Sequence, residues 1–132
     1  MEMFMPFETI TLKPKSLFLH KVEGYLIPSD LKKHIIDFWL DQDNMGPNVN
    51  VIWDLREANL TNISFETADY LANTIVENVL ANCKPGLTAL LINDSPEKHI
   101  AAYLANLLGS TQIRKIKMFH QFDQALKFVD VD

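Results

Sequence analysis

The 132-residue sequence is poor in cysteine, in clustered basic residues and in long apolar runs. Its single cysteine, Cys83, cannot form an intrachain disulfide, so nothing in the sequence points to an oxidising compartment. The 12 lysines and arginines never form a run of more than two, although nucleic-acid phosphates attract proteins through clustered positive charge. We therefore expect no nucleic-acid partner.

No apolar stretch approaches the roughly 20 residues of a membrane-spanning helix. Residues 1–7 are largely apolar but too short for the core of a secretion signal, and Glu2 stands where such a signal carries a basic residue. We therefore expect a cytoplasmic protein without an integral membrane segment. Residues 1–7 are either an exposed arm for a partner or a second subunit, which would allow a homodimer, or simply the lead into the first strand.

What is present is an ordinary globular composition. Hydrophobic residues make up 48% and charged residues 22% of the chain, and the formal net charge is -5. The length fits one domain over residues 1–132 that buries enough apolar surface to fold without disulfides or metals.

Apolar patterns separated by turn residues predict the order of the elements. Strand-like residues 8–12 and 17–27 flank a turn at residues 13–16, which predicts a β-hairpin, with Gly24 at a bulge or a close backbone approach. The remaining chain alternates between helical periodicity and short apolar runs. It predicts strands at residues 49–53, 87–92 and 114–119, and helices that begin near Ser29, Ser64, Ser95 and Phe122.

This order predicts an α/β fold. Strands that alternate with helices form right-handed crossovers, so we expect a mixed, mainly parallel sheet that opens with the hairpin and has four helices packed on it. The expected core contains the apolar positions of the helices and central strands, namely Ile52, Leu71, Ile75, Val79, Leu90, Ile92 and Leu104.

Three segments resemble a known superfamily. Residues 22–27 match a strand, a glycine and a turn into a helix, residues 51–58 match a strand that ends in an acidic-x-Arg segment, and residues 118–128 match a closing strand and helix. They resemble the STAS-domain superfamily and, within it, the SpoIIAA-like subgroup, which is also similar to the CRAL-TRIO lipid-binding domains. The resemblance implies a regulatory module that binds a partner protein, as anti-sigma-factor antagonists do, or alternatively a small carrier for a lipid-like ligand.

One segment departs from the antagonist pattern. Those proteins carry a phosphorylated serine within an Asp-Ser-x-Gly-like segment, whereas residues 60–66 here contain neither the Asp-Ser pair nor the glycine. We therefore predict that no anti-sigma-type kinase phosphorylates Ser64 or Thr61.

Polar residues follow two of the predicted strands. Asp54 and Arg56 come after the central strand, where open α/β sheets bind ligands, and they are either a polar anchor or a structural ion pair. Ser64 and Ser95 precede helices, where they are either helix caps or part of an anion site.

We expect any amphipathic ligand, or a partner's polar loop, to bind at the edge of the sheet where these two strands end, near Asp54, Arg56, Ser64 and Ser95. A ligand's apolar part would lie among Trp39, Trp53 and Phe65.

No catalytic, metal or cofactor motif is present in the sequence. The four histidines lack ligand spacing, and there is no nucleophile elbow, dinucleotide-binding glycine pattern or phosphate-binding loop. We therefore expect no enzyme activity, metal or cofactor. A cavity distinguishes the two remaining functions, since a carrier needs an apolar space of a few hundred Å³ and an interaction module needs only a filled core.

Overall fold

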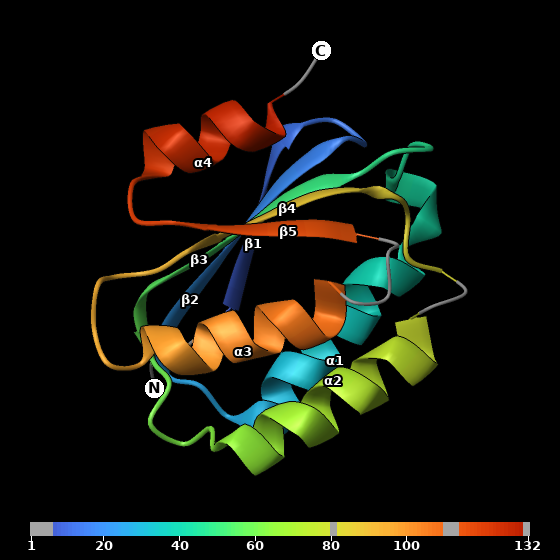
Figure 1. Cartoon of the computed structure of the whole chain (residues 1–132). Helices are drawn as coiled ribbons and strands as arrows, with labels where there is room; N and C mark the ends of the chain where they lie inside the picture. The colour runs from blue at the N-terminus through green and yellow to red at the C-terminus, as the bar shows by residue number, and fades with distance from the viewer. Residues whose placement is uncertain (1–6, 80–81, 110–113, 131–132) are drawn as a thin grey trace, which may run out of the picture.

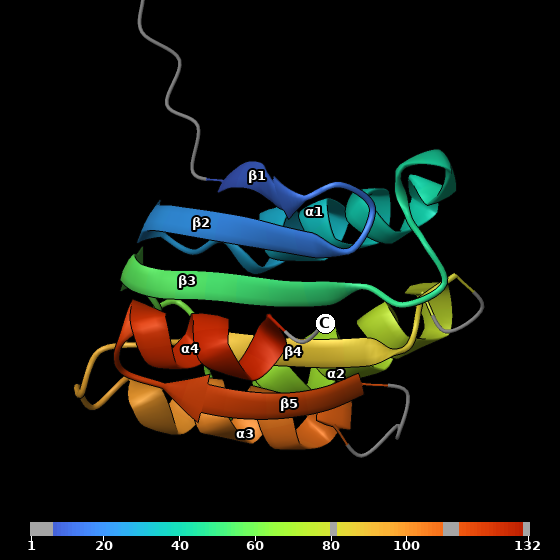
Figure 2. The same ribbon diagram turned by 90° about the horizontal axis from the view of Figure 1, so that it is seen from above.

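The chain forms a mixed five-stranded sheet whose strands lie side by side in the order in which they occur in the sequence (Figures 1 and 2). This computed structural model describes residues 7–79, 82–109 and 114–130. The strands are β1 (Phe7–Lys13), β2 (Leu17–Tyr25), β3 (Asn50–Asn59), β4 (Gly86–Leu91) and β5 (Arg114–Phe119). The helices are α1 (Pro28–Leu40), α2 (Phe65–Val79), α3 (Lys98–Gly109) and α4 (Phe122–Val129), with a short 3₁₀ helix at Gln42–Asn44.

The opening hairpin supplies the only antiparallel pairing among the described strands. β1 pairs antiparallel with β2, while the pairs β2–β3, β3–β4 and β4–β5 are parallel. The hairpin turn places Lys15 in the left-handed region at φ 65°, and Gly24 near the end of β2 has φ 77°. The predicted α/β fold class, with a mainly parallel sheet and four helices, is therefore confirmed.

The helices cover the two faces of the sheet unequally. α1, α2 and α3 lie on one face, which we call the three-helix face, and α4 alone lies on the other, which we call the α4 face (Figure 1). α4 lies over β3, β4 and β5 and leaves β1 and β2 without a helix above them (Figure 2). Asn50 ties the end of α4 to the sheet, because its amide nitrogen donates to the carbonyl of Val129 at 2.7 Å.

Each face of the sheet has its own apolar core. On the α4 face, Leu19, Ile52 and Leu91 pack with Ala125 and Val129. The three-helix face holds the larger cluster, which includes Val22, Leu31, Trp39, Val51, Leu71, Ile75 and Ile92.

Most of the predicted core residues are buried. Ile52, Leu71, Ile75 and Ile92 are buried, whereas Leu90 and Leu104 are only half-buried because they line a cavity described below. The side chain of Val79 lies outside the described residues, as do residues 1–6 of the predicted N-terminal arm.

Two element boundaries differ from the prediction. β3 continues to Asn59 instead of ending at Trp53, because pairing with β2 as far as Tyr25 extends it through a polar stretch. α3 begins at Lys98 instead of near Ser95, since residues 95–98 form a turn in which the Lys98 amide donates to the Ser95 carbonyl at 3.0 Å. Within the described residues, no helix is long and apolar enough to cross a membrane.

Candidate functional site

Asp54 and Arg56 form an ion pair inside β3. The guanidinium donates from Nε to Oδ1 at 3.0 Å and from Nη2 to Oδ2 at 2.9 Å, and the Arg56 amide also donates to Oδ1. Asp54 is 6% exposed, and burial acts to raise its pKa, but the hydrogen bonds and charge of Arg56, together with Lys21, lower the pKa overall. Of the two alternatives considered for this pair, the geometry matches the structural ion pair.

The loop that follows β4 contacts both the last part of β3 and the loop after β3. The Asn93 amide nitrogen donates to the Arg56 carbonyl at 2.8 Å, and the Glu97 carboxylate accepts from the Leu60 amide at 3.2 Å. These contacts join the loop after β4 to β3 and to the loop after β3 at the carboxyl edge, by which we mean the edge where the parallel strands end. The side chains of Asn93 and Glu97 therefore bond to backbone groups of the chain itself.

Ser64 caps α2, while Ser95 does not begin a helix. The Thr67 amide donates to the Ser64 hydroxyl oxygen at 3.1 Å, which is the usual N-cap bond. Ser95 stands in the turn before α3, three residues ahead of its first residue. The predicted pair of helix starts therefore reduces to one start, at Ser64.

The three aromatic residues predicted beside the ligand lie in different places. Phe65 opens α2 at the carboxyl edge and packs edge-on against Tyr103, with ring centres 5.0 Å apart. Trp53 lies on the three-helix face, opposite to Asp54, because successive strand residues alternate in direction. Trp39 lies near the start of β5, with its ring 5.0 Å from the guanidinium carbon of Arg114. The structure thus does not gather Trp39 and Trp53 around Asp54 and Arg56.

The strand order of this sheet differs from that of sheets in which a ligand crevice forms between crossovers. In doubly wound sheets, ligands bind where the strand order reverses and adjacent crossovers leave on opposite faces. Here the order never reverses, and α1, α2 and α3 all pass over the same face (Figure 1). The described sheet therefore has no reversal of strand order to support ligand binding at this edge, and the predicted binding location stays a prediction.

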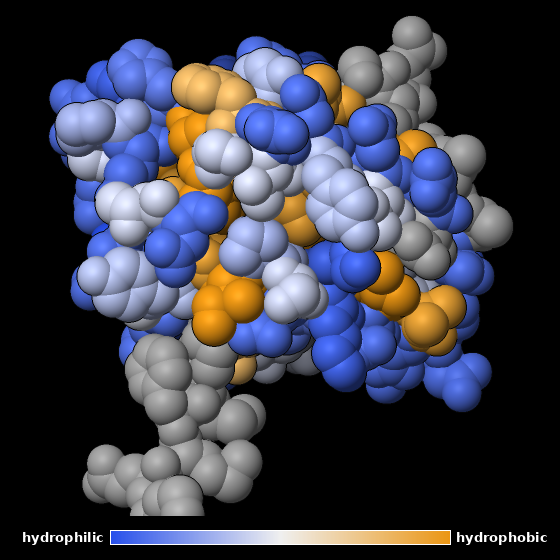
Figure 3. Space-filling view, turned by 90° about the horizontal axis from the view of Figure 1, so that it is seen from below, coloured by the Kyte–Doolittle hydropathy of each residue, from blue (hydrophilic) through white to orange (hydrophobic). Residues whose placement is uncertain are grey.

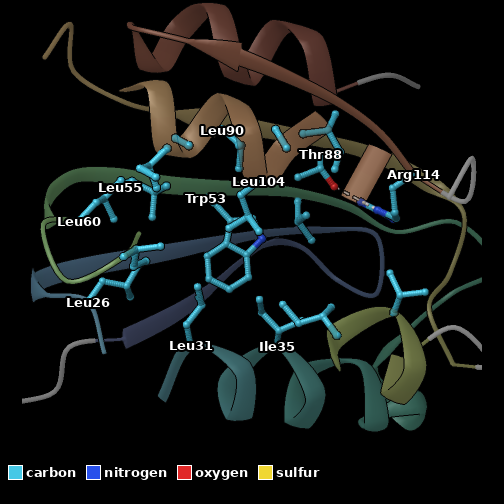
Figure 4. Close-up of a pocket in the computed structure, with 18 of the residues that line it drawn as sticks. Leu26, Leu31, Ile35, Trp53, Leu55, Leu60, Thr88, Leu90, Leu104 and Arg114 are labelled. Atoms are coloured by element: carbon cyan, nitrogen blue, oxygen red, sulfur yellow. Dashed lines mark hydrogen bonds between the residues drawn. The ribbon is translucent and has the colours of Figure 1, made fainter. Parts of the chain in front are cut away.

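A cavity of about 140 Å³ lies instead between the three-helix face of the sheet and the helices that cover it (Figure 4). Trp39 and Trp53 line it, so two of the predicted residues do share a site. Leu26, Leu55 and Leu60 lie at one end, and Thr88 and Arg114 lie at the other (Figure 4). The rest of the lining is almost entirely aliphatic, including Ile35, Val51, Ile63, Ile75, Leu90 and Ile100.

Arg114 is a cavity residue that the sequence prediction missed. It is 8% exposed, and its guanidinium donates to the Thr88 hydroxyl at 3.1 Å and to the carbonyls of Lys84 at 2.9 Å, Leu87 at 2.8 Å and Val49. Burial lowers the pKa of the guanidinium to about 10, so it is charged at neutral pH. The available signal was a basic residue on the same side of the strand as the apolar Ile116 and Met118.

The sequence analysis also missed a cluster in which His20 of β2 and His34 of α1 both contact Thr9 of β1. Thr9 Oγ1 lies 2.9 Å from His20 Nδ1 and 3.2 Å from His34 Nε2, and the ring of His20 stacks on Trp53 at 4.2 Å between centres. His20 is fully buried, and this burial, with the nearby His34, lowers its pKa to about 3. In the described part of the chain, no group of three or more His, Cys, Asp and Glu side chains could hold a metal ion.

Large apolar side chains are exposed near the carboxyl edge. Tyr25 at the end of β2 is 63% exposed, Ile27 before α1 is 49% exposed, and Phe65 at the start of α2 is 53% exposed. The end of β2 and the starts of α1 and α2 lie at the same end of the molecule (Figure 1). On the face seen from below, by contrast, hydrophilic side chains interrupt the apolar surface (Figure 3).

Comparison with known proteins supports the fold. No protein-family model matches the sequence, and no curated protein matches it. A solved structure of an uncharacterised DUF3478-family protein with a SpoIIAA-like fold, from Shewanella loihica PV-4, is 11% identical and superposes with a TM-score of 0.61 over 98% of each chain. STAS membership and similarity to CRAL-TRIO domains stay predictions, because a likeness at this identity is one of fold alone. The chain has a SpoIIAA-like fold.

Proposed function

We propose that this chain is a non-enzymatic, cytoplasmic regulatory module that binds a partner protein at the carboxyl edge. The exposure of Tyr25, Ile27 and Phe65 at one end of the molecule is the observation that supports this proposal. Exposed apolar patches on a protein surface often mark interaction sites. Aromatic residues are also enriched among the residues that contribute most of the binding energy at interfaces. The predicted partner therefore offers an apolar or aromatic surface to this end.

The experiment compares surface variants in partner capture. Tagged protein purified from its native cells is analysed by quantitative mass spectrometry, with the double variant Tyr25→Ser/Phe65→Ser beside the wild type. The matched control is Leu40→Ser, which removes an equally exposed apolar side chain at the far end of α1.

We expect to find a partner that the wild type and Leu40→Ser both retain. Its recovery with the double variant should fall about tenfold or more, since aromatic hot spots at interfaces contribute about 2 kcal/mol or more. Equal recovery with all three proteins would contradict the proposed surface. Circular dichroism of each variant checks that its fold is unchanged.

A second proposed function is a carrier for a small apolar ligand, and the cavity favours it. Its volume of about 140 Å³ is less than the few hundred Å³ that drug-sized ligands occupy. It is close to the roughly 150 Å³ of an engineered apolar cavity that stays dry and binds benzene. A ligand carried here has about the size of a benzene ring.

A further inference from the structure

The two arginines of this chain differ in how their charge is compensated. Arg56 is held by both carboxylate oxygens of Asp54 and lies partly in solvent. Arg114 is buried, and no described carboxylate lies within ion-pair distance of it. Its hydrogen-bond acceptors are the neutral oxygens of Thr88, Val49, Lys84 and Leu87.

The hydrogen bonds of Arg114 to the described residues use four of the five N–H groups of its guanidinium. A guanidinium has five N–H groups. Nε uses one on Thr88, Nη1 uses two on the carbonyls of Val49 and Lys84, and Nη2 uses one of its two on Leu87. Among the described residues, the second N–H of Nη2 therefore has no acceptor.

Thr88 brings a second donor to the same place. Its hydroxyl oxygen accepts the Nε–H of Arg114 at 3.1 Å, so its own proton can be donated elsewhere. Thr88 is buried and, like Arg114, lines the cavity (Figure 4). An anion at this end would accept two hydrogen bonds and compensate a buried charge that otherwise has neutral oxygens and the Trp39 ring around it.

The remainder of the cavity suits only an apolar group. Trp53 lies in its middle, and Leu26, Leu55 and Leu60 lie at the far end (Figure 4). A ligand must therefore be charged at one end and apolar over the rest. Two donors match the two oxygens of a carboxylate, whereas a phosphate would bring more oxygens and more charge than two donors satisfy.

We propose that the cavity binds a small carboxylic acid with an apolar body about the size of a benzene ring, its carboxylate on Arg114 and Thr88. This inference rests on the carrier function proposed above, and it adds the charge and the chemical class of the ligand. It is independent of the partner surface at the carboxyl edge.

The test is an NMR titration of ¹⁵N-labelled protein with three probes that share a benzene ring and differ in charge, namely benzoate, toluene and benzylamine. Benzoate is expected to shift the amides of cavity-lining residues and to bind about tenfold or more tightly than toluene, as one charge-assisted hydrogen bond would give. Benzylamine, a cation, is expected not to bind.

The variants Thr88→Val and Arg114→Met assign the anion site. Both are expected to lower benzoate affinity about tenfold or more without weakening toluene binding. The matched control is Lys115→Met, which removes a positive charge from the adjacent, exposed position on the opposite side of β5. If Arg114→Met does not fold, Thr88→Val carries the test alone, because it leaves the loop contacts of Arg114 in place.

Each result separates the two proposals. Equal binding of benzoate and toluene at the cavity would keep the carrier function and overturn the carboxylate site. An unchanged benzoate affinity in a folded Thr88→Val or Arg114→Met would also overturn the site. Binding of none of the three probes would overturn both the site and the carrier function.

Discussion

At the scale of single residues, His20 is a histidine that the fold keeps neutral. It is enclosed by Trp53, Phe38 and His34, and its Nε2 has no hydrogen-bond partner within the described structure. A buried imidazolium without an anion is costly, so burial first and the neighbouring His34 second hold its pKa at about 3.

This pKa makes stability depend on pH. The unfolded chain protonates His20 below about pH 6.5 and the folded chain does not, so the stability present above pH 6.5 is lost as pH falls toward 3. Between pH 7 and pH 5 this loss amounts to about 2 kcal/mol of unfolding free energy.

Replacing His20→Phe removes this proton linkage. The ring is kept, so we expect urea unfolding to give a pH 7 to pH 5 loss about 2 kcal/mol smaller than in the wild type. Titrating groups that do not contact His20 are common to both proteins and cancel in the comparison. An identical loss in both proteins would mean that His20 is protonated in the folded state.

The sequence predicted single residues only where the chemistry is local. The Asp54–Arg56 pair and the Ser64 cap were foreseeable, because their partners lie two and three residues away. The partners of Arg114 come from residues up to 65 positions distant, and those of His20 from β1, α1 and β3. No local pattern contains such contacts, so the cavity and its charged end became visible only in the folded chain.

At the scale of elements, periodicity located every strand and helix, whereas the boundaries depended on neighbours. Leu71 and Ile75 of α2 are buried in the core as predicted, because an amphipathic helix packs its apolar side against the sheet. β3 runs past its predicted end because β2 offers it further partners. The same extension places Asp54 and Arg56 in a strand instead of a loop.

Gly86 marks a place where two elements approach too closely for a side chain. It opens β4 with φ 153°, and a Cβ there would lie 2.1 Å from the Val49 carbonyl oxygen. We expect Gly86→Ala to lower the free energy of unfolding by about 2–4 kcal/mol, since both backbone strain and a backbone clash must be relieved. Chemical denaturation measures the change.

Gly46 supplies the matched control for this prediction. Its Cβ would meet the Lys15 carbonyl oxygen at 3.4 Å, which is close to ordinary contact. Gly46→Ala should therefore change the unfolding free energy by less than about 1 kcal/mol. A Gly86→Ala protein as stable as Gly46→Ala would show that the start of β4 can shift away from Val49.

At the scale of the whole molecule, the predicted single domain should unfold as one unit. Both tryptophans lie in the cluster on the three-helix face, whereas α4 packs on the other face. Tryptophan fluorescence therefore reports one face, while far-UV circular dichroism reports all elements. We expect the two urea transitions to coincide, as they do in two-state domains of this size. A circular dichroism transition that begins before the fluorescence change would indicate that the α4 face melts separately.

The sequential strand order also bears on how the chain folds during its synthesis. Every strand pairs with the strand made just before it, so each pairing closes the shortest loop that the order of elements allows, which limits its cost in chain entropy. Once Asn59 has left the ribosome, the hairpin, α1 and β3 have all been synthesised and can pack on one another. The sheet then grows at a single edge, one strand with its crossover helix at a time. Until β5 arrives, that growing edge is the open side of β4, which is the surface a chaperone would have to shield.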